Sequence, residues 1–514
     1  MLNANYKRIA RNTLMLYIRM GVTMLVSLFT SRIVLRALGV EDFGIYNLTG
    51  GVVALFSFLN AAMSASCQRF LCFELGAQNL ANVGKVFATS RRIHWHISIL
   101  VIILAESVGL WFVNTRLNIP AERMHAANWV YQCSVVTTFL GILQVPYYSL
   151  IIAHEKMNVF AWSGMLATFM RLGIVYLLLL GGFDRLIVYS LLVMGTYWIM
   201  LGFYIIYCHI TFPAILNYRS ANEWMIRKTM ISFSGWSLLG SVANVSAQQG
   251  VNIVLNIFCG VTVNAAYGIA NQVNGVIYQF ISNFQQAFNP QIVKLYSAND
   301  LHALEELLHR ASKYSFYLMY LLSLPLLLNT EFVLQVWLGV IPPYTAAFLQ
   351  WTLFFFLIES VSAPLWMSIQ ATGKIRKYQM IVSFSIFCNL PLSILIVKSG
   401  YSPVFVIAAK SLIDLLLTLW RILFLSRLIR ISARDYFRKV IVNITIGAIV
   451  AGVLPFIVAQ LMAGGWSRML LTGLMVLVCV PVTTYTWGSS REERRYFTEL
   501  IRGKVSCFLH GIEA

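Results

Sequence analysis

The sequence predicts an all-α integral membrane protein of about 14 transmembrane helices, arranged as two six-helix lobes in a parallel pseudo-two-fold repeat plus a C-terminal helix pair. Composition, apolar segments and an internal repeat support this. Of 514 residues, 59% are hydrophobic and 11% charged, with mean hydropathy +0.74, whereas soluble domains carry about 25% charged residues. The composition excludes a soluble enzyme, a nucleic-acid reader and a disordered chain.

The spans follow from apolar stretches of about 20 residues, the length that crosses a bilayer. They lie at roughly 13–37, 44–66, 93–113, 128–152, 159–181, 186–208, 230–258, 264–288, 314–338, 345–370, 379–397, 403–425, 440–461 and 467–487. Basic residues precede the first stretch, as in a signal peptide, but that stretch contains Arg19 and Arg32 and lacks a small-residue cleavage site. We therefore expect a retained first span.

The distribution of Lys and Arg supports an even number of spans. With the N-terminus placed in the cytoplasm, the cytoplasmic segments hold 27 of these residues and the outer segments 5, as the positive-inside rule requires. Both termini are therefore expected in the cytoplasm. The formal charge of +19 is then a topogenic signal that also favours contact with membrane lipid, and it needs no nucleic acid.

An internal repeat, in which the second half of the chain follows the first, organises the spans. Pro146, Ala153 and Lys156 recur as Pro364, Ala371 and Lys374, all three at the same offset, and a segment near 33–47 resembles one near 253–271. Six spans separate the copies, so both halves have the same orientation. Chance similarity between apolar helices is the alternative.

The repeat predicts four parts of the chain. Residues 1–208 form an N-lobe, 209–229 a cytoplasmic linker, 230–425 a C-lobe, and 426–514 the last two spans with a basic cytoplasmic tail. Two lobes of one orientation suit alternating access, in which a substrate site lies between rigid bundles.

No motif indicates an enzyme, a cofactor or a metal site. The eight cysteines form no CxxC pair and no Cys/His cluster, and the chain contains no P-loop. We expect no catalytic residues, no cofactor and no bound metal.

The segment Arg36-Ala37-Leu38-Gly39-Val40-Glu41-Asp42-Phe43-Gly44-Ile45-Tyr46 resembles bacterial polysaccharide-export flippases, the O-antigen (Wzx-like) family of the multidrug/oligosaccharidyl-lipid/polysaccharide exporter superfamily. The resemblance extends to the fourteen-span layout. It implies that an undecaprenyl-pyrophosphate-linked oligosaccharide is moved from the inner to the outer leaflet of the bacterial inner membrane, for surface polysaccharides such as lipopolysaccharide. It also implies a cationic cavity, ion-gradient coupling, and polymerases or glycosyltransferases as partners of a functional monomer.

Arginines inside the spans are the candidate pyrophosphate ligands, because a charge at the bilayer midplane costs about 2.5–3.5 kcal/mol on insertion scales. Arg19 and Arg171 lie deep in the first and fifth predicted spans, and guanidinium binds phosphate bidentately. Arg32 and Arg36 share a helix face near the outer end of the first span. For this second pair, a position at the membrane interface is the alternative interpretation.

Ion coupling needs a carboxylate that changes its charge state. The candidates are Glu106, Glu359 and Asp414, with Lys410 four residues before Asp414 on the same face. The alternatives are structural: Lys410 and Asp414 neutralise each other, Glu359 bonds to neighbouring hydroxyls, and Glu106 pairs with Arg19 or Arg171.

Amides concentrate in the seventh and eighth predicted spans, where they suit sugar hydroxyls because they both donate and accept hydrogen bonds. The candidate glycan ligands are Gln248, Asn252, Asn271, Gln272, Gln279 and Asn283. Hydrogen bonding between helices is the alternative role.

Three other functions compete with the oligosaccharide flippase. A cation-coupled multidrug exporter of the same superfamily predicts a cavity dominated by carboxylates, and a lipid II-type flippase differs only in cargo. A membrane-bound glycan polymerase or glycosyltransferase needs a large outer loop, whereas the longest predicted outer connection has about 15 residues.

Overall fold

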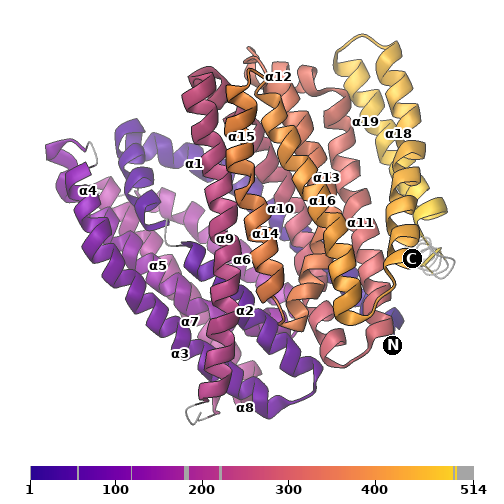
Figure 1. Ribbon diagram of the computed structural model, residues 1–514. Helices are drawn as coiled ribbons and strands as arrows, with labels where there is room; N and C mark the ends of the chain where they lie inside the picture. The colour runs from indigo at the N-terminus through magenta and orange to yellow at the C-terminus, as the bar shows by residue number, and fades with distance from the viewer. Residues whose placement is uncertain are drawn as a thin grey trace, which may run out of the picture. The chain divides into compact units, whose positions relative to one another are not determined.

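The computed structural model describes residues 2–54, 57–116, 119–178, 184–218, 223–489 and 493–494. These residues form helices and turns, with no strand among them (Figure 1). The all-α prediction is therefore confirmed. Each of the fourteen predicted spans falls on one to three of the helices.

The first half of the chain begins with a long helix that bends at Gly39. This residue has φ 82° and ψ 169°, and the bend falls between the first and second predicted spans. The helices of this half are α1 (Leu2–Ala54), α2 (Ser57–Gly76), α3 (Leu80–Leu104), η1 (Ala105–Gly109), α4 (Leu110–Arg116), η2 (Ala121–Arg123), α5 (Met124–Ala153), α6 (Met157–Leu178), α7 (Arg185–Thr211) and α8 (Pro213–Leu216).

The second half has a similar succession of helices and continues into the C-terminal pair. Its helices are α9 (Trp224–Cys259), α10 (Val261–Ser297), α11 (Leu301–Leu328), α12 (Thr330–Leu338), α13 (Thr345–Thr372), α14 (Arg376–Phe387), α15 (Asn389–Lys398) and α16 (Val404–Ile429). The pair comprises α17 (Ala433–Tyr436), η3 (Phe437–Val442), α18 (Asn443–Leu461), α19 (Trp466–Thr483) and η4 (Thr484–Gly488).

Length and hydropathy identify the membrane spans within the described residues. Eight helical segments there are long and apolar enough to cross a bilayer, and a ninth is added if α11 and α12, which meet at 76°, form one span. The other five predicted spans, which carry charged or amide side chains, coincide with α1, α2, α9, α10 and α16.

Contacts between residues divide the chain into two compact units. Unit 1 comprises residues 1–245, 286–300 and 370–383, and unit 2 comprises 246–285, 301–369 and 384–514. Unit 1 thus includes the C-terminal ends of α10 and α13 as well as the first half of the chain. The lobe and linker boundaries expected from the repeat remain a prediction.

Two turns of unit 1 repeat each other in backbone conformation. Gln78, between α2 and α3, has φ 56°, and Asn299, at the corresponding place between α10 and α11, has φ 57°. In both turns the N–H of the following residue bonds to the carbonyl five residues earlier, at 3.0 and 3.1 Å. This is the left-handed cap that ends many helices, and its recurrence supports the internal repeat.

Two further pairs of left-handed residues follow the same repeat. Gly39 and Gly260, which have φ 82° and 86°, are related by the offset that relates Gln78 to Asn299. Glu155 and Gly373 have φ 58° and 74°. They are as far apart in the sequence as the recurring prolines Pro146 and Pro364. A shared succession of turns is evidence independent of apolar composition.

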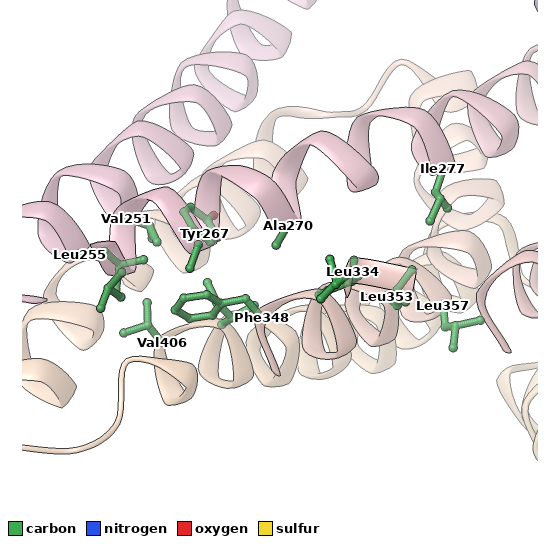
Figure 2. Close-up of a cluster of buried hydrophobic side chains, with 14 of the residues drawn as sticks. Val251, Leu255, Tyr267, Ala270, Ile277, Leu334, Phe348, Leu353, Leu357 and Val406 are labelled. Atoms are coloured by element: carbon green, nitrogen blue, oxygen red, sulfur yellow. The ribbon is translucent and has the colours of Figure 1, made fainter. Parts of the chain in front are cut away.

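The core of unit 2 lies where α9 and α10 pack on α13 and α16. Figure 2 shows Tyr267 and Phe348 facing each other near Leu255 and Val406. The two rings meet edge to face, with centroids 5.8 Å apart, a geometry that aromatic pairs prefer. In unit 1 the main contacts are between α1 and α6 and between α5 and α7.

Two tyrosines of α11 attach the C-terminal helix pair to the rest of unit 2. The Tyr320 hydroxyl donates to the Ala448 carbonyl at 2.9 Å, and the hydroxyls of Tyr317 and Tyr320 lie where Gly447 and Gly452 have no side chain. A Cβ at either glycine would collide with a tyrosine. Small residues that let helices approach closely are the usual means of helix association in membranes.

We expect Gly447→Val to lower the free energy of unfolding by about 1–3 kcal/mol, because the added side chain overpacks a filled contact. Gly473→Val is the matched control, since nothing lies within 4 Å of a Cβ at this α19 position. Thermal unfolding of the detergent-solubilised variants measures both. Equal melting temperatures for the two variants would contradict the assigned packing.

Candidate functional site

Arg19 is a partly buried cation with an aromatic partner. Its guanidinium lies 4.4 Å from the centroid of the Phe160 ring on α6, and it fits there because Gly164 has no side chain: a Cβ at Gly164 would lie 2.7 Å from Arg19 Nε. The Nη1 atom is buried and has no hydrogen-bond partner among the described groups. Arg19 can therefore offer an N–H to an incoming acceptor.

Arg171 lies among tyrosines. Its Nη2 donates to the Tyr197 hydroxyl at 3.2 Å, and the guanidinium is 5.8 Å from the same ring. Tyr46 and Tyr189, whose rings meet edge to face at 4.9 Å, lie within electrostatic range of it. The side chain is exposed.

Neither Arg19 nor Arg171 forms an ion pair with a carboxylate among the described residues. Glu106, expected as one alternative partner, instead accepts a hydrogen bond from Gln132 at 3.1 Å. Arg36 is exposed, and the side chain of Arg32 lies outside the described residues.

A cluster of charges forms between α13 and α16 in unit 2. The Nη1 atom of Arg421 lies 3.7 Å from Glu359 Oε2 and 3.4 Å from Asp414 Oδ1, and it donates to the Ser362 hydroxyl. We call these four residues the Arg421 cluster. Asp414 Oδ2 is buried with no hydrogen-bond partner among the described groups, so one carboxylate oxygen can still accept a proton or a cation.

Two of the expected coupling residues, Glu359 and Asp414, contact the same arginine, Arg421. Sequence reasoning did not identify Arg421. Lys410, the expected partner of Asp414, instead has its Nζ 4.5 Å from the centroid of the Phe355 ring, and Arg421 bonds to Asp414. Arg421 follows Asp414 by about two helical turns and so shares its face. That spacing is the signal that could have identified it.

The amides differ in exposure. Gln272 and Gln279 are exposed on α10, about two helical turns apart, Asn252 and Asn271 are partly buried, and Asn283 is buried. The side chain of Gln248 lies outside the described residues. The exposed face of α10 also includes Tyr278, whose ring centroid lies 5.6 Å from that of Phe356.

Arg123 joins three segments of unit 1 that are distant in sequence. Its Nε donates to Asp42 at 2.8 Å and its Nη1 to Asp184 at 2.7 Å, while Asp184 also caps the first turn of α7. Asp42 belongs to the motif that carries the family resemblance, and the structure assigns it this structural contact. Sequence reasoning gave Arg123 no role.

No three His, Cys, Asp or Glu side chains within the described ranges come close enough to hold a metal ion.

Comparison with known proteins identifies the fold. A family model described as MatE matches residues 231–395. No curated protein matches the chain by sequence. Solved structures match over 83% of the chain. One is an outward-facing multidrug resistance MATE family transporter of the MOP superfamily, with a TM-score of 0.70, 14% sequence identity and 97% of that chain covered. Another is a MATE structure in the straight conformation, with a TM-score of 0.69, 16% sequence identity and 97% of that chain covered.

A third solved structure, a MOP superfamily transporter from Pyrococcus furiosus, matches with a TM-score of 0.68 and 14% identity, covering 83% of this chain and 96% of that one. These identities establish the fold and leave the cargo open. The chain is a multi-pass membrane protein with the fold of MATE transporters, and its residues 231–395 carry the MatE match.

Proposed function

We propose that this protein is a flippase that moves an undecaprenyl-pyrophosphate-linked oligosaccharide from the inner to the outer leaflet of the bacterial cytoplasmic membrane. The observation that carries the proposal is Arg19, an intramembrane guanidinium with a buried, unbonded Nη1 and no carboxylate partner among the described residues. A cation held in this state suits an anionic cargo.

The energetic reason is the cost of an unpaired charge in hydrocarbon. A phosphate oxygen at Arg19 supplies the missing acceptor, and charge-assisted bonds of this kind are roughly twice as strong as neutral ones. Arg171, which bonds only a neutral tyrosine hydroxyl among the described groups, provides a second cation in the same unit. Two cations match the two phosphates of a pyrophosphate.

The glycan is assigned to the exposed face of α10. Gln272 and Gln279 lie on this face with Tyr278, so hydrogen-bonding amides alternate with an aromatic surface. Sugar rings are bound in this way, with hydroxyls against amides and the apolar face of the ring against an aromatic side chain.

The Arg421 cluster is proposed as the coupling site. With both carboxylates ionised, Arg421 and the nearby Lys410 balance the charge of Glu359 and Asp414. Uptake of a proton or a sodium ion by Asp414 weakens its bond to Arg421 and changes the contact between α13 and α16. A gradient of that ion can then favour one state of the carrier over another.

A cation-coupled multidrug exporter is the second candidate. The solved multidrug resistance transporter of the same fold favours it, as do the two carboxylates of the Arg421 cluster. The Pyrococcus furiosus transporter is described as having a binding pocket of reverse polarity, which suggests a different function for that protein. Pocket charge is therefore the property that should separate the candidates here.

The remaining assignments follow from the first proposal. We place the chain in the inner membrane with both termini in the cytoplasm, as a monomer that works beside a polysaccharide polymerase or a glycosyltransferase. A lipid II-type flippase differs from this proposal only in its cargo.

Arg19→Gln and Arg171→Gln should each lower the flipping rate about tenfold or more, because a hydrogen bond to a charged group contributes about 1.5–3 kcal/mol. The assay uses proteoliposomes that contain the purified protein and a labelled undecaprenyl-pyrophosphate oligosaccharide. A membrane-impermeant glycosidase reports the glycan that reaches the outer face.

Arg434→Gln is the matched control, since this arginine is exposed at the start of α17, and it should flip at the wild-type rate. Unchanged flipping in both span variants would remove the headgroup role. Protein that flips no oligosaccharide but moves cationic dyes would favour the multidrug exporter.

Glu359→Gln and Asp414→Asn should abolish the stimulation of transport by an ion gradient while gradient-independent exchange persists. Each change removes a carboxylate whose charge the coupling ion alters. The measurement compares flipping with and without proton and sodium gradients, and Glu331→Gln, an exposed carboxylate in the first turn of α12, serves as control. Full gradient stimulation in both variants would exclude the Arg421 cluster as the coupling site.

A further inference from the structure

Four turns come together at one end of unit 1. They are the turns after α2, α5, α10 and α13, and all four belong to this unit. The approach is close: a Cβ at Gly76 would lie 2.6 Å from Lys294 Cα, and the Ser297 hydroxyl donates to the Phe73 carbonyl. The distribution of Lys and Arg assigns this end to the cytoplasm.

A buried ion pair connects two of these turns. Lys294 Nζ lies 2.6 Å from Glu155 Oε1, and Gln291 Nε2 donates to Glu155 Oε2 at 2.8 Å. The Glu155 side chain is 1% exposed and that of Lys294 is 24% exposed. Both oxygens of the carboxylate in the turn after α5 are thus bound by the C-terminal end of α10.

Glu155 occupies a conformation that its residue type disfavours. Its φ is 58°, whereas the repeat-related position 373 is a glycine with φ 74°. The left-handed conformation brings the Cβ of any other residue too close to the backbone, and glycine avoids this cost. Because a glycine would form this turn more easily, the carboxylate has a role that backbone geometry does not supply.

The repeat-related contact has different chemistry. Arg69 of α2 donates to the Ala371 carbonyl at 2.9 Å, and its guanidinium lies 4.5 Å from the Phe70 ring and 5.0 Å from the Phe73 ring. Within the described residues, this contact joins a cation to a neutral carbonyl. The α5–α10 contact depends instead on two opposite charges, which move away from each other when the turns separate.

We propose that Glu155 and Lys294 form a latch that holds this end of unit 1 closed and that opens in each transport cycle. Gln291 completes the latch by binding the second carboxylate oxygen. The inference rests on the proposed transport function, since a carrier has to expose this end to load cargo from the cytoplasm, but it is independent of which cargo is carried.

The native Cys72 provides a reporter for the latch. It is fully buried on α2 and lies within electrostatic range of Lys294 and Glu155, so a thiol reagent reaches it when this end opens. Cys133, also buried but on α5 and beside Ser190, reports general unfolding. Two full-length proteins, each with one of these cysteines as its only cysteine, are labelled with a fluorescent maleimide in detergent.

Lys294→Gln should raise the labelling rate of Cys72 about tenfold or more, because it leaves a buried carboxylate without its cation. Glu155→Gln should raise it by a smaller factor, since the remaining Lys294 is partly exposed. The exchanged pair Glu155→Lys with Lys294→Glu should return the rate toward the wild-type value. Labelling of Cys133 should stay unchanged throughout.

Glu155→Gly distinguishes the role of the carboxylate from that of the turn conformation. It removes the carboxylate, while glycine adopts the left-handed conformation of the turn without strain. It should also raise Cys72 labelling, whereas Gln78→Gly, which relieves the same strain at an exposed turn, should not. Unchanged Cys72 labelling in the Glu155 and Lys294 variants, or an equal rise at Cys133, would overturn the latch. A rise confined to Cys72 in a protein that flips no oligosaccharide would retain the latch and reject the cargo.

Discussion

A charge inside a membrane-spanning helix needs a partner, because hydrocarbon supplies none, and this constraint determines where the chemistry of the protein lies. Unit 2 meets the constraint internally, since Arg421 lies between Glu359 and Asp414. Unit 1 meets it incompletely, since Arg19 has a phenylalanine ring and a buried N–H without an acceptor among the described groups. The first arrangement suits exchange of a small cation within a neutral cluster. The second suits an anion brought by the cargo, so in the proposed function headgroup binding and ion coupling belong to different units.

The internal repeat fixes the backbone of the turns and leaves their side chains free to differ. Gln78 and Asn299 have nearly the same φ, and so do Gly39 and Gly260, because each turn has to end one helix and start the next in the same way. At the third pair the backbone is again similar, but Glu155 replaces the glycine found at position 373. The repeat thus supplies the scaffold, and a single departure from it places a buried charge where two helical segments meet.

Apolar stretches were sufficient to predict where the helices lie, including the five spans that length and hydropathy do not identify in the structure. Hydropathy also located Glu359 and Asp414, since charges stand out in apolar segments. It could not choose their partner: Lys410 and Arg421 share a face of α16 with Asp414, and the choice depends on which side chain reaches α13. The contacts of Arg123 with Asp42 and Asp184, and that of Lys294 with Glu155, join residues that are many helical turns apart in sequence. No local pattern specifies pairs so far apart, which is why sequence reasoning missed them.

A shared fold does not determine which cargo a protein carries. Solved transporters with 14–16% identity to this chain share its fold, because helix length and packing are set largely by the bilayer. In the proposed function, cargo choice depends instead on the charges that meet the cargo, since juxtaposed like charges oppose binding. An organic cation approaching Arg19 and Arg171 would meet repulsion, whereas a pyrophosphate would meet attraction at both. The sign of charge at Arg19 and Arg171, rather than the fold, is therefore the physical basis on which we propose a lipid-linked oligosaccharide as the cargo.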